Sequence, residues 1–263
     1  GGCEAFGVCG KDPDTAALQD LLVYVAKGVS VLAHQARGLS LPTAAADAFV
    51  EEALFATVTN VDFDPTRLEA HLHEGAIVRD GLAQAIAAAG GQIVKDGPAS
   101  WRPAADLNGL IAQGELVSIE LRKAAVGADL AGLEELVIYG LKGTAAYAHH
   151  ARVLGQYDDE VSAFFHQALA ALTADQAQDA LLGLSLEVGR VNLRVMELLD
   201  AANTGTYGHP VPTPVRIHPV KGKAILVSGH DLKDLEVLLD QTAGKGINIY
   251  THGEMLPPHG YPE

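Results

Sequence analysis

The sequence predicts a multidomain α and α/β protein, in which duplicated three-helix bundles precede the start of a domain with a parallel sheet. Two observations lead to this prediction. The helical pattern of Leu18–Leu39 recurs at Leu133–Leu154, and with a constant offset of 115 ten of the 22 positions are identical. Near the carboxyl end, residues 224–263 have the pattern of a strand, a helix and a second strand.

The first copy begins with a long helix. Asp12 is a suitable N-cap, Pro13 suits the first helical position, and apolar residues then recur at helical spacing. Asp64 is placed to cap a later helix in the same way. The helices expected in this copy are residues 13–38, 47–59 and 65–89. Residues 90–110, which are rich in Gly, Pro and Asp, are expected to form a loop.

The second copy is expected to repeat this arrangement. Its helices are predicted at residues 129–154, 158–172 and 173–200. The two bundles would then occupy about residues 10–90 and 128–202 of a helical domain that covers residues 1–205. A period of this length indicates a duplicated subdomain, because the repeats of solenoid proteins are much shorter.

Several polar or small residues are matched between the copies. Among the matched pairs are Gly28 with Gly143, Lys27 with Lys142, His34 with His149, and Asp20 with Glu135. A glycine inside a helix costs about 1 kcal/mol relative to alanine, so the paired glycines predict close approach of another backbone. The histidine and acid pairs allow two interpretations, metal ligation and structural polar contacts, of which we favour the second.

A linker and the beginning of a Rossmann-like α/β domain are predicted after the helices. Residues 206–223 are rich in Pro and Gly, and we place the domain boundary there. Ala224–Ser228 is a short apolar run, as in a strand buried on both faces, and Ile247–Tyr250 is the second strand. Asp231 caps the intervening helix. Two strands joined in this way are normally parallel neighbours.

His230 and Glu254 each follow the carboxyl end of one of these strands. In open parallel sheets, ligands bind outside the carboxyl ends of the strands, so we expect the two side chains to lie close together. An imidazole and a carboxylate can ligate a metal or act as acid and base. The alternative is structural: His230 caps the helix and Glu254 is a solvated loop residue.

Composition excludes several classes of partner. The net charge of −15 argues against binding to nucleic acid or to an anionic membrane surface. No apolar run approaches the ~20 residues of a transmembrane helix, and the absence of a visible signal peptide predicts a cytoplasmic protein. The two cysteines, Cys3 and Cys9, indicate metal or redox chemistry. A two-stranded sheet is unlikely to be stable alone, so we expect a longer parent chain with residues 224–263 as a truncated domain.

Five segments resemble the hybrid cluster protein family, also called prismane proteins or hydroxylamine reductases. They read GVCGKDPDTAALQDLLVYVAKG, LKGTAAYAHHARVLG, NTGTYGHP, ILVSGHDLKDLEVLLDQT and NIYTHGEMLPPHGYPE, and they are spread over nearly the whole chain, from residue 7 to residue 263. The resemblance implies an N-terminal domain of two three-helix bundles, followed by α/β domains with parallel sheets.

The resemblance also implies two iron–sulfur cofactors. Cys3 and Cys9 match the last two of four cysteines that bind a [4Fe-4S] cluster, and their spacing is more similar to this cubane type than to the type with wider spacing. His230 and Glu254 match ligands of a hybrid [4Fe-2O-2S] cluster, whose other ligands lie in segments that this chain lacks. His252 and His259 flank Glu254, and they either deliver protons or form supporting hydrogen bonds.

The activity implied by the resemblance is reduction of hydroxylamine to ammonia and water. The partners implied are a small nitrogenous substrate and an electron donor, either an NADH-linked flavin and iron–sulfur reductase or a ferredoxin-like protein. Two alternatives remain open. One is nitric oxide reduction or protein S-nitrosylation on the same scaffold, and the other is a non-catalytic helical protein that binds metal or senses redox state.

Overall fold

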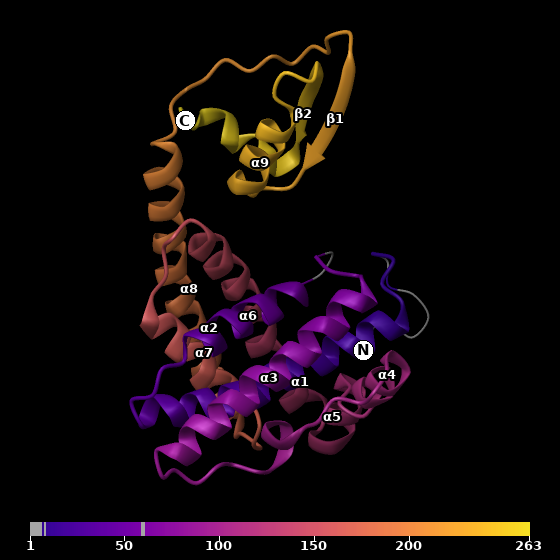
Figure 1. The fold of residues 1–263 in the computed structure, drawn as a ribbon, viewed down its shortest axis with the longest axis vertical. Coiled ribbons are helices and arrows are strands. Elements are labelled where there is room, and N and C mark those ends of the chain that lie inside the picture. The colour runs from indigo at the N-terminus through magenta and orange to yellow at the C-terminus, as the bar shows by residue number, and fades with distance from the viewer. Residues whose placement is uncertain (1–6, 8, 59–60) are drawn as a thin grey trace. The chain divides into compact units, whose positions relative to one another are not determined.

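The computed structural model describes residues 7, 9–58 and 61–263. Its helices are α1 (Pro13–Gly38), α2 (Ala44–Ala56), α3 (Pro65–Ala88), α4 (Leu107–Glu115), α5 (Ile119–Val126), α6 (Ala128–Val153), α7 (Asp159–Ala171), α8 (Gln178–Tyr207) and α9 (Leu232–Thr242). Its strands are β1 (Lys223–Ser228) and β2 (Ile247–His252), and short 3-10 helices lie at Gly97–Ser100, Gly253–Met255 and Pro257–Gly260. Figure 1 shows this order, which confirms the predicted fold class.

The chain forms two compact units. The first comprises Gly1–His149 and Asp158–Val195, and the second comprises His150–Tyr157 and Met196–Glu263. The domain limits predicted from the sequence, at residues 1–205, 206–223 and 224–263, do not coincide with these units and stay predictions. Within the predicted linker, residues 208–222 contain neither a helix nor a strand.

Helix α1 is the centre of the first unit. It packs against α2, α3, α4 and α7. The Asp12 side chain accepts a hydrogen bond from the Thr15 backbone N–H, as predicted for the cap. Leu18, Leu22 and Leu32 along this helix are completely buried. The apolar stripe in the sequence therefore marks a core helix.

The duplication is visible in the helix bounds. Helices α6 and α7 have the same lengths as α1 and α2, and each begins 115 residues after its counterpart. The helix predicted at residues 47–59 has the wrong bounds, since α2 begins three residues earlier, at Ala44, and ends at Ala56. Asp47 therefore lies inside the helix, where Arg37 and His166 bind its side chain. The helix predicted at residues 173–200 is wrong at both ends, since α8 runs from Gln178 to Tyr207. The hydroxyl group of the buried Tyr207 donates a hydrogen bond to Glu236.

Helices α4 and α5 were not predicted. Helix α4 contains two glycines, which lower the helical propensity of a nine-residue segment. A Cβ on Gly114 would lie 2.2 Å from the backbone oxygen of Ala17, so α4 packs very close to α1. Tertiary packing therefore determines this helix, and its local sequence pattern is too weak to predict it.

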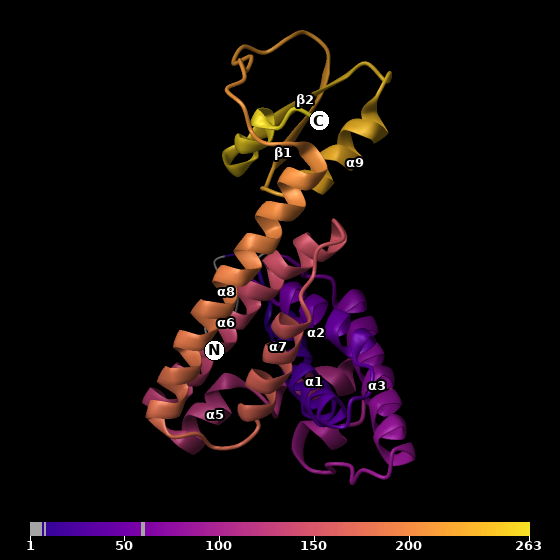
Figure 2. The same ribbon diagram turned by 90° about the vertical axis from the view of Figure 1, so that its left-hand side faces the viewer.

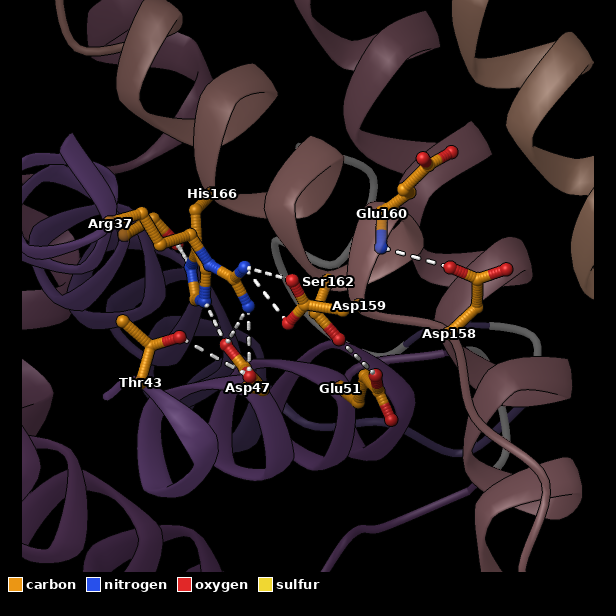
Figure 3. A network of polar contacts seen from close by, with 10 residues as sticks. Arg37, Thr43, Asp47, Glu51, Asp158, Asp159, Glu160, Ser162 and His166 are labelled. Atoms are coloured by element: carbon orange, nitrogen blue, oxygen red, sulfur yellow. Dashed lines mark hydrogen bonds and ion pairs between the residues drawn. The ribbon is translucent and has the colours of Figure 1, made fainter. Parts of the chain in front are cut away.

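A buried polar network joins the two copies (Figure 3). The imidazole of His166 donates from Nε2 to Asp47 Oδ1 at 2.8 Å, and its Nδ1 lies 3.1 Å from the Ser30 hydroxyl. Arg37 donates to both oxygens of Asp47 at 3.0 Å. Burial alone raises the pKa of Asp47, but the hydrogen bonds from His166 and Arg37 outweigh burial and keep that pKa below its ordinary value.

A second buried contact is related to the first by the duplication. Position 162 is the counterpart of Asp47, and position 166 is the counterpart of Glu51. The Ser162 hydroxyl donates to Glu51 Oε1 at 3.4 Å, while Asp47 pairs with His166. The first contact therefore joins position 47 of the first copy to the counterpart of position 51 in the second copy. The other contact joins position 51 of the first copy to the counterpart of position 47. Such reciprocal contacts are the pattern of a two-fold symmetric interface.

The matched glycines have different environments. A Cβ on Gly28 would lie 2.2 Å from the Pro98 carbonyl oxygen, which confirms the predicted close approach of another backbone. At Gly143, apart from its chain neighbours and the backbone of its own helix, no heavy atom of the described residues lies within 4 Å of that position, so the same prediction is wrong there. Pro98 belongs to the connection between the copies, and this connection has no counterpart after α8.

The second unit contains the strands. β1 and β2 are parallel, with Ser228 opposite His252, and α9 lies beside them (Figure 2). The expectation that the first strand is buried on both faces is wrong for this chain, because Leu226 is 70% exposed. In the part of this unit that the structure describes, one crossover helix accompanies the two strands, and it covers little of their apolar surface.

Helix α1 is also long and apolar enough to cross a membrane by length and composition. The expectation that no apolar segment approaches this length therefore requires correction for the described residues. Two-thirds of the relevant window is buried inside the protein, as in the core helix of a soluble domain.

We predict that Asp47→Asn lowers the free energy of unfolding at pH 7 by about 2–4 kcal/mol, because Arg37 and His166 lose their buried carboxylate partner. The pKa of Asp47 is lowered by folding, so its contribution is present above its unfolded pKa of about 3.9 and is lost as pH falls through the folded pKa. Urea unfolding across pH should therefore show a smaller acid loss in the variant.

Asp159→Asn is the matched control for this experiment. Its carboxylate accepts from the same Arg37 but is 80% exposed. We expect a loss of at most about 1 kcal/mol for an exposed pair. Equal effects of the two substitutions would contradict the role given to the buried carboxylate.

We predict opposite effects for alanine at the two matched glycines. Gly28→Ala should destabilise the protein by about 1–3 kcal/mol, because the new methyl group overlaps the Pro98 carbonyl. Gly143→Ala lies at an exposed helical position and should stabilise it by about 0.5–1 kcal/mol. Urea unfolding followed by circular dichroism measures both, and a change of the same sign at both positions would refute the assignment.

Candidate functional site

The strand register places His230 beside Glu254. Ser228 and His252 are opposite each other at the ends of the two parallel strands. A glycine with positive φ follows each of them, at +151° for Gly229 and +60° for Gly253, and the candidate residue comes next. The two candidates therefore occupy equivalent places, two residues beyond the last paired position of their strands.

The side chains of this pair approach each other. His230 Nδ1 lies 3.5 Å from Glu254 Oε2, and the side chains are 49% and 81% exposed. This gap is long for a hydrogen bond. In tetrahedral zinc sites, where nitrogen and oxygen donors lie about 2.0–2.1 Å from the metal, two such donors are about 3.4 Å apart. The separation of the two side chains is close to that value. The pair thus fits two positions of a larger ligand set, and ligation itself stays a prediction.

His150 contacts both His230 and the neighbouring Asp231. The Asp231 carboxylate caps α9 by accepting from the Lys233 backbone N–H at 3.0 Å, and it lies 3.4 Å from His150 Nδ1. Burial raises the pKa of Asp231, but interaction with His150 outweighs it and lowers that pKa overall. The rings of His150 and His230 meet edge to face, with centroids 5.5 Å apart.

The sequence predicts only a capping role for Asp231 and indicates no role for His150. The adjacent histidines 149 and 150 at the end of α6 were the available signal, but only His149 has a counterpart in the first copy. Nothing in the local pattern shows that residue 150 contacts a segment 80 residues later. Long-range contacts of this kind follow from the fold.

The two flanking histidines are held by hydroxyl groups. His252 Nδ1 lies 3.0 Å from Ser228 Oγ, and His259 Nε2 lies 2.7 Å from Thr251 Oγ1. Both contacts fix a ring close to the end of β2. The choice between proton delivery and a supporting hydrogen-bond role stays open.

Of the remaining candidates, Cys9, His34 and His149 belong to the other compact unit. Cys3 lies outside the residues that the structure describes, and Cys9 is exposed and has a free thiol. His34 is exposed, and His149 packs against the Phe55 ring at 5.2 Å. Among the described residues, no three His, Cys, Asp or Glu side chains are placed to hold one metal ion.

A cavity of about 760 Å³, lined by both charged and apolar residues, lies in the first unit. Matched residues of both copies line it: Asp20 and Lys27 come from α1, while Glu135 and Lys142 come from α6. Burial lowers the pKa of Lys27, and Glu135 opposes this most strongly. Burial also lowers the pKa of Lys142, opposed most strongly by Asp20. In both cases the principal attraction crosses from one copy to the other.

A sequence profile described as "Prismane/CO dehydrogenase family" matches residues 1–263. The chain belongs to this family. The match covers both the duplicated helices and the strand–helix–strand unit, so the two units described above are parts of one family architecture.

Curated relatives in this family carry the name hydroxylamine reductase. The protein of Rhodospirillum rubrum is 55% identical over 267 residues, which cover 99% of this chain and 49% of the relative. The protein of Methanocella arvoryzae is 51% identical over 264 residues, covering 100% and 49%. That of Syntrophobacter fumaroxidans is 52% identical over 263 residues, covering 99% and 48%. The chain spans about half the length of these relatives.

We predict that the attraction across the cavity is measurable by a double-mutant cycle. Lys27→Met should lower stability at pH 7 by about 1–3 kcal/mol, because Glu135 loses the cation that most lowers its pKa. Glu135→Leu should have a similar effect, and the double variant should recover much of the loss. Urea unfolding measures the coupling.

The exposed ion pair of Lys123 and Glu120 is the control for this cycle, with a separation of 3.6 Å. Its coupling should be no more than about 0.5 kcal/mol. Simple additivity of Lys27→Met and Glu135→Leu would show that the charges do not interact across the cavity.

Proposed function

We propose that this chain is part of a cytoplasmic iron–sulfur oxidoreductase that reduces hydroxylamine to ammonia and water. The observation that carries the proposal is the whole-chain similarity to curated hydroxylamine reductases, at 55% identity for the first of them. Family membership favours this assignment over a non-catalytic helical protein. No observation on this chain favours nitric oxide as the substrate over hydroxylamine.

The reaction requires two electrons and two protons for each hydroxylamine. The N–O bond breaks, nitrogen leaves as ammonia and oxygen leaves as water. When bound, the iron–sulfur clusters supply the electrons and an iron position open to a small substrate. We propose a [4Fe-4S] cluster held in part by Cys3 and Cys9, and a hybrid [4Fe-2O-2S] cluster held in part by His230 and Glu254.

The donor chemistry of the second site supports this division. Imidazole and carboxylate are harder ligands than thiolate, so they suit iron that carries oxygen bridges. His230 and Glu254 come from two different strand ends, and both are partly accessible, which leaves room for further ligands. His252 and His259 lie beside them with their rings fixed by Ser228 and Thr251.

The chain's own residues can also hold protons near this site. Glu254 is the most accessible acidic group there. His252 contacts Ser228 through Nδ1, so its other ring nitrogen, Nε2, is the one proposed to hold or release a proton. The electron donor is proposed to be an NADH-linked flavin and iron–sulfur reductase or a ferredoxin-like protein. The net charge of −15 favours a donor with a basic docking surface.

The test uses the full-length parent protein, purified without oxygen. We expect His230→Ala and Glu254→Gln to lose the spectroscopic signature of the hybrid cluster and to lower kcat for hydroxylamine more than about 100-fold, beyond the range usual for outer-shell partners. Cys9→Ser should remove the other cluster and leave the hybrid signature. Iron and sulfide analysis with Mössbauer spectroscopy measures both.

His34→Ala is the control, because this exposed histidine of α1 lies in the other compact unit. It should retain both clusters and full turnover. Retention of the hybrid signature in both His230→Ala and Glu254→Gln would refute the ligand assignment. Faster turnover of nitric oxide than of hydroxylamine by the intact protein would refute the substrate.

A further inference from the structure

His150 and Asp231 form a chain of contacts that ends on the proposed ligand His230. Asp231 is fixed first, because its carboxylate accepts from the backbone N–H of Lys233 and so caps α9. Its Oδ2 then lies 3.4 Å from His150 Nδ1. The two side chains are only 12% and 23% exposed, whereas that of His230 is 49% exposed.

His150 in turn restricts the ring of His230. Their planes are inclined by 87°, and the centroids are 5.5 Å apart, which is the favourable edge-to-face arrangement of two aromatic rings. On its other side, His230 Nδ1 approaches Glu254 Oε2 at 3.5 Å. A half-exposed imidazole with contacts on two sides has far fewer accessible ring orientations than a free surface histidine.

We propose that His150, held by Asp231, is a positioning residue that sets the ring orientation of His230 for ligation. This inference rests on the proposed function, because it assumes that His230 binds the hybrid cluster. Groups beyond the direct ligands commonly orient a ligating histidine, and their loss costs about 10–100-fold in metal affinity. Here the orienting contact is a second ring, and the charged group acts one step further away.

A positioning role for His150 and a purely structural role predict different measurements. A structural contact would affect the unfolding of the second unit but not the electronic coupling between His230 and iron. A positioning contact changes the orientation of the imidazole, and therefore the nitrogen hyperfine coupling seen by pulsed electron paramagnetic resonance. It also changes how fast iron is lost to a chelator.

Three variants of the full-length holoprotein separate the contacts. His150→Ala removes the ring and its interaction with Asp231. His150→Phe keeps a ring against His230 but cannot donate to the carboxylate. Asp231→Asn keeps the cap of α9, because asparagine caps helices as well as aspartate does, but it removes the charge.

We expect chelator-induced iron loss to be about 10–100-fold faster in His150→Ala, with an altered hyperfine coupling of His230. His150→Phe and Asp231→Asn should show smaller changes in the same direction. His149→Ala is the neighbouring control, since its ring packs against Phe55, and it should match the wild type. Melting curves identify any variant that does not fold.

The outcomes distinguish this inference from the proposed function. If His230→Ala retains the hybrid cluster, the proposed ligand assignment fails. If His230→Ala loses it while folded His150→Phe and Asp231→Asn give wild-type coupling and iron loss, the assignment stands and the positioning role is overturned. Because these two variants keep the ring packing and the cap respectively, the test remains decisive even if His150→Ala does not fold.

Discussion

The buried carboxylate of Asp47 is the interaction on which the helical unit depends most. It lies between Arg37 of α1 and His166 of α7, so it joins the first copy of the duplicated bundle to the second. Removing such a group from water is unfavourable unless strong donors replace the water. Arg37 and His166 supply them, and the helices can then meet only in the orientation that brings all three residues together.

The duplication predicted the repeated helices well, because α1 and α6 carry strong periodic patterns that depend on nothing outside each helix. It failed where copies have different neighbours. Gly28 meets the Pro98 carbonyl, whereas no described residue from outside its own helix lies close to Gly143, although the two are matched in sequence. Helix α4 was missed for a related reason, since Gly114 is explained only by its close contact with α1.

The candidate site shows the same division between local and non-local information. His230 and Glu254 were predictable neighbours, because parallel strands place their carboxyl ends at one edge and the register fixes which residues are level. His150 was not predictable, since it reaches the site from the end of a helix far away in sequence. Its place depends on how α6 ends, and no motif in residues 224–263 specifies that.

The pairing of unlike positions between the copies affects the newly made chain during synthesis. Two identical first copies, docked in the same way, would bury Asp47 opposite Glu51 twice, whereas the native partners are His166 and Ser162. Like charges in a buried interface repel strongly. Pairing of the first bundle with the same bundle of a neighbouring nascent chain is therefore unfavourable. Pairing with the second bundle of its own polypeptide, once that bundle has been synthesised, is favoured.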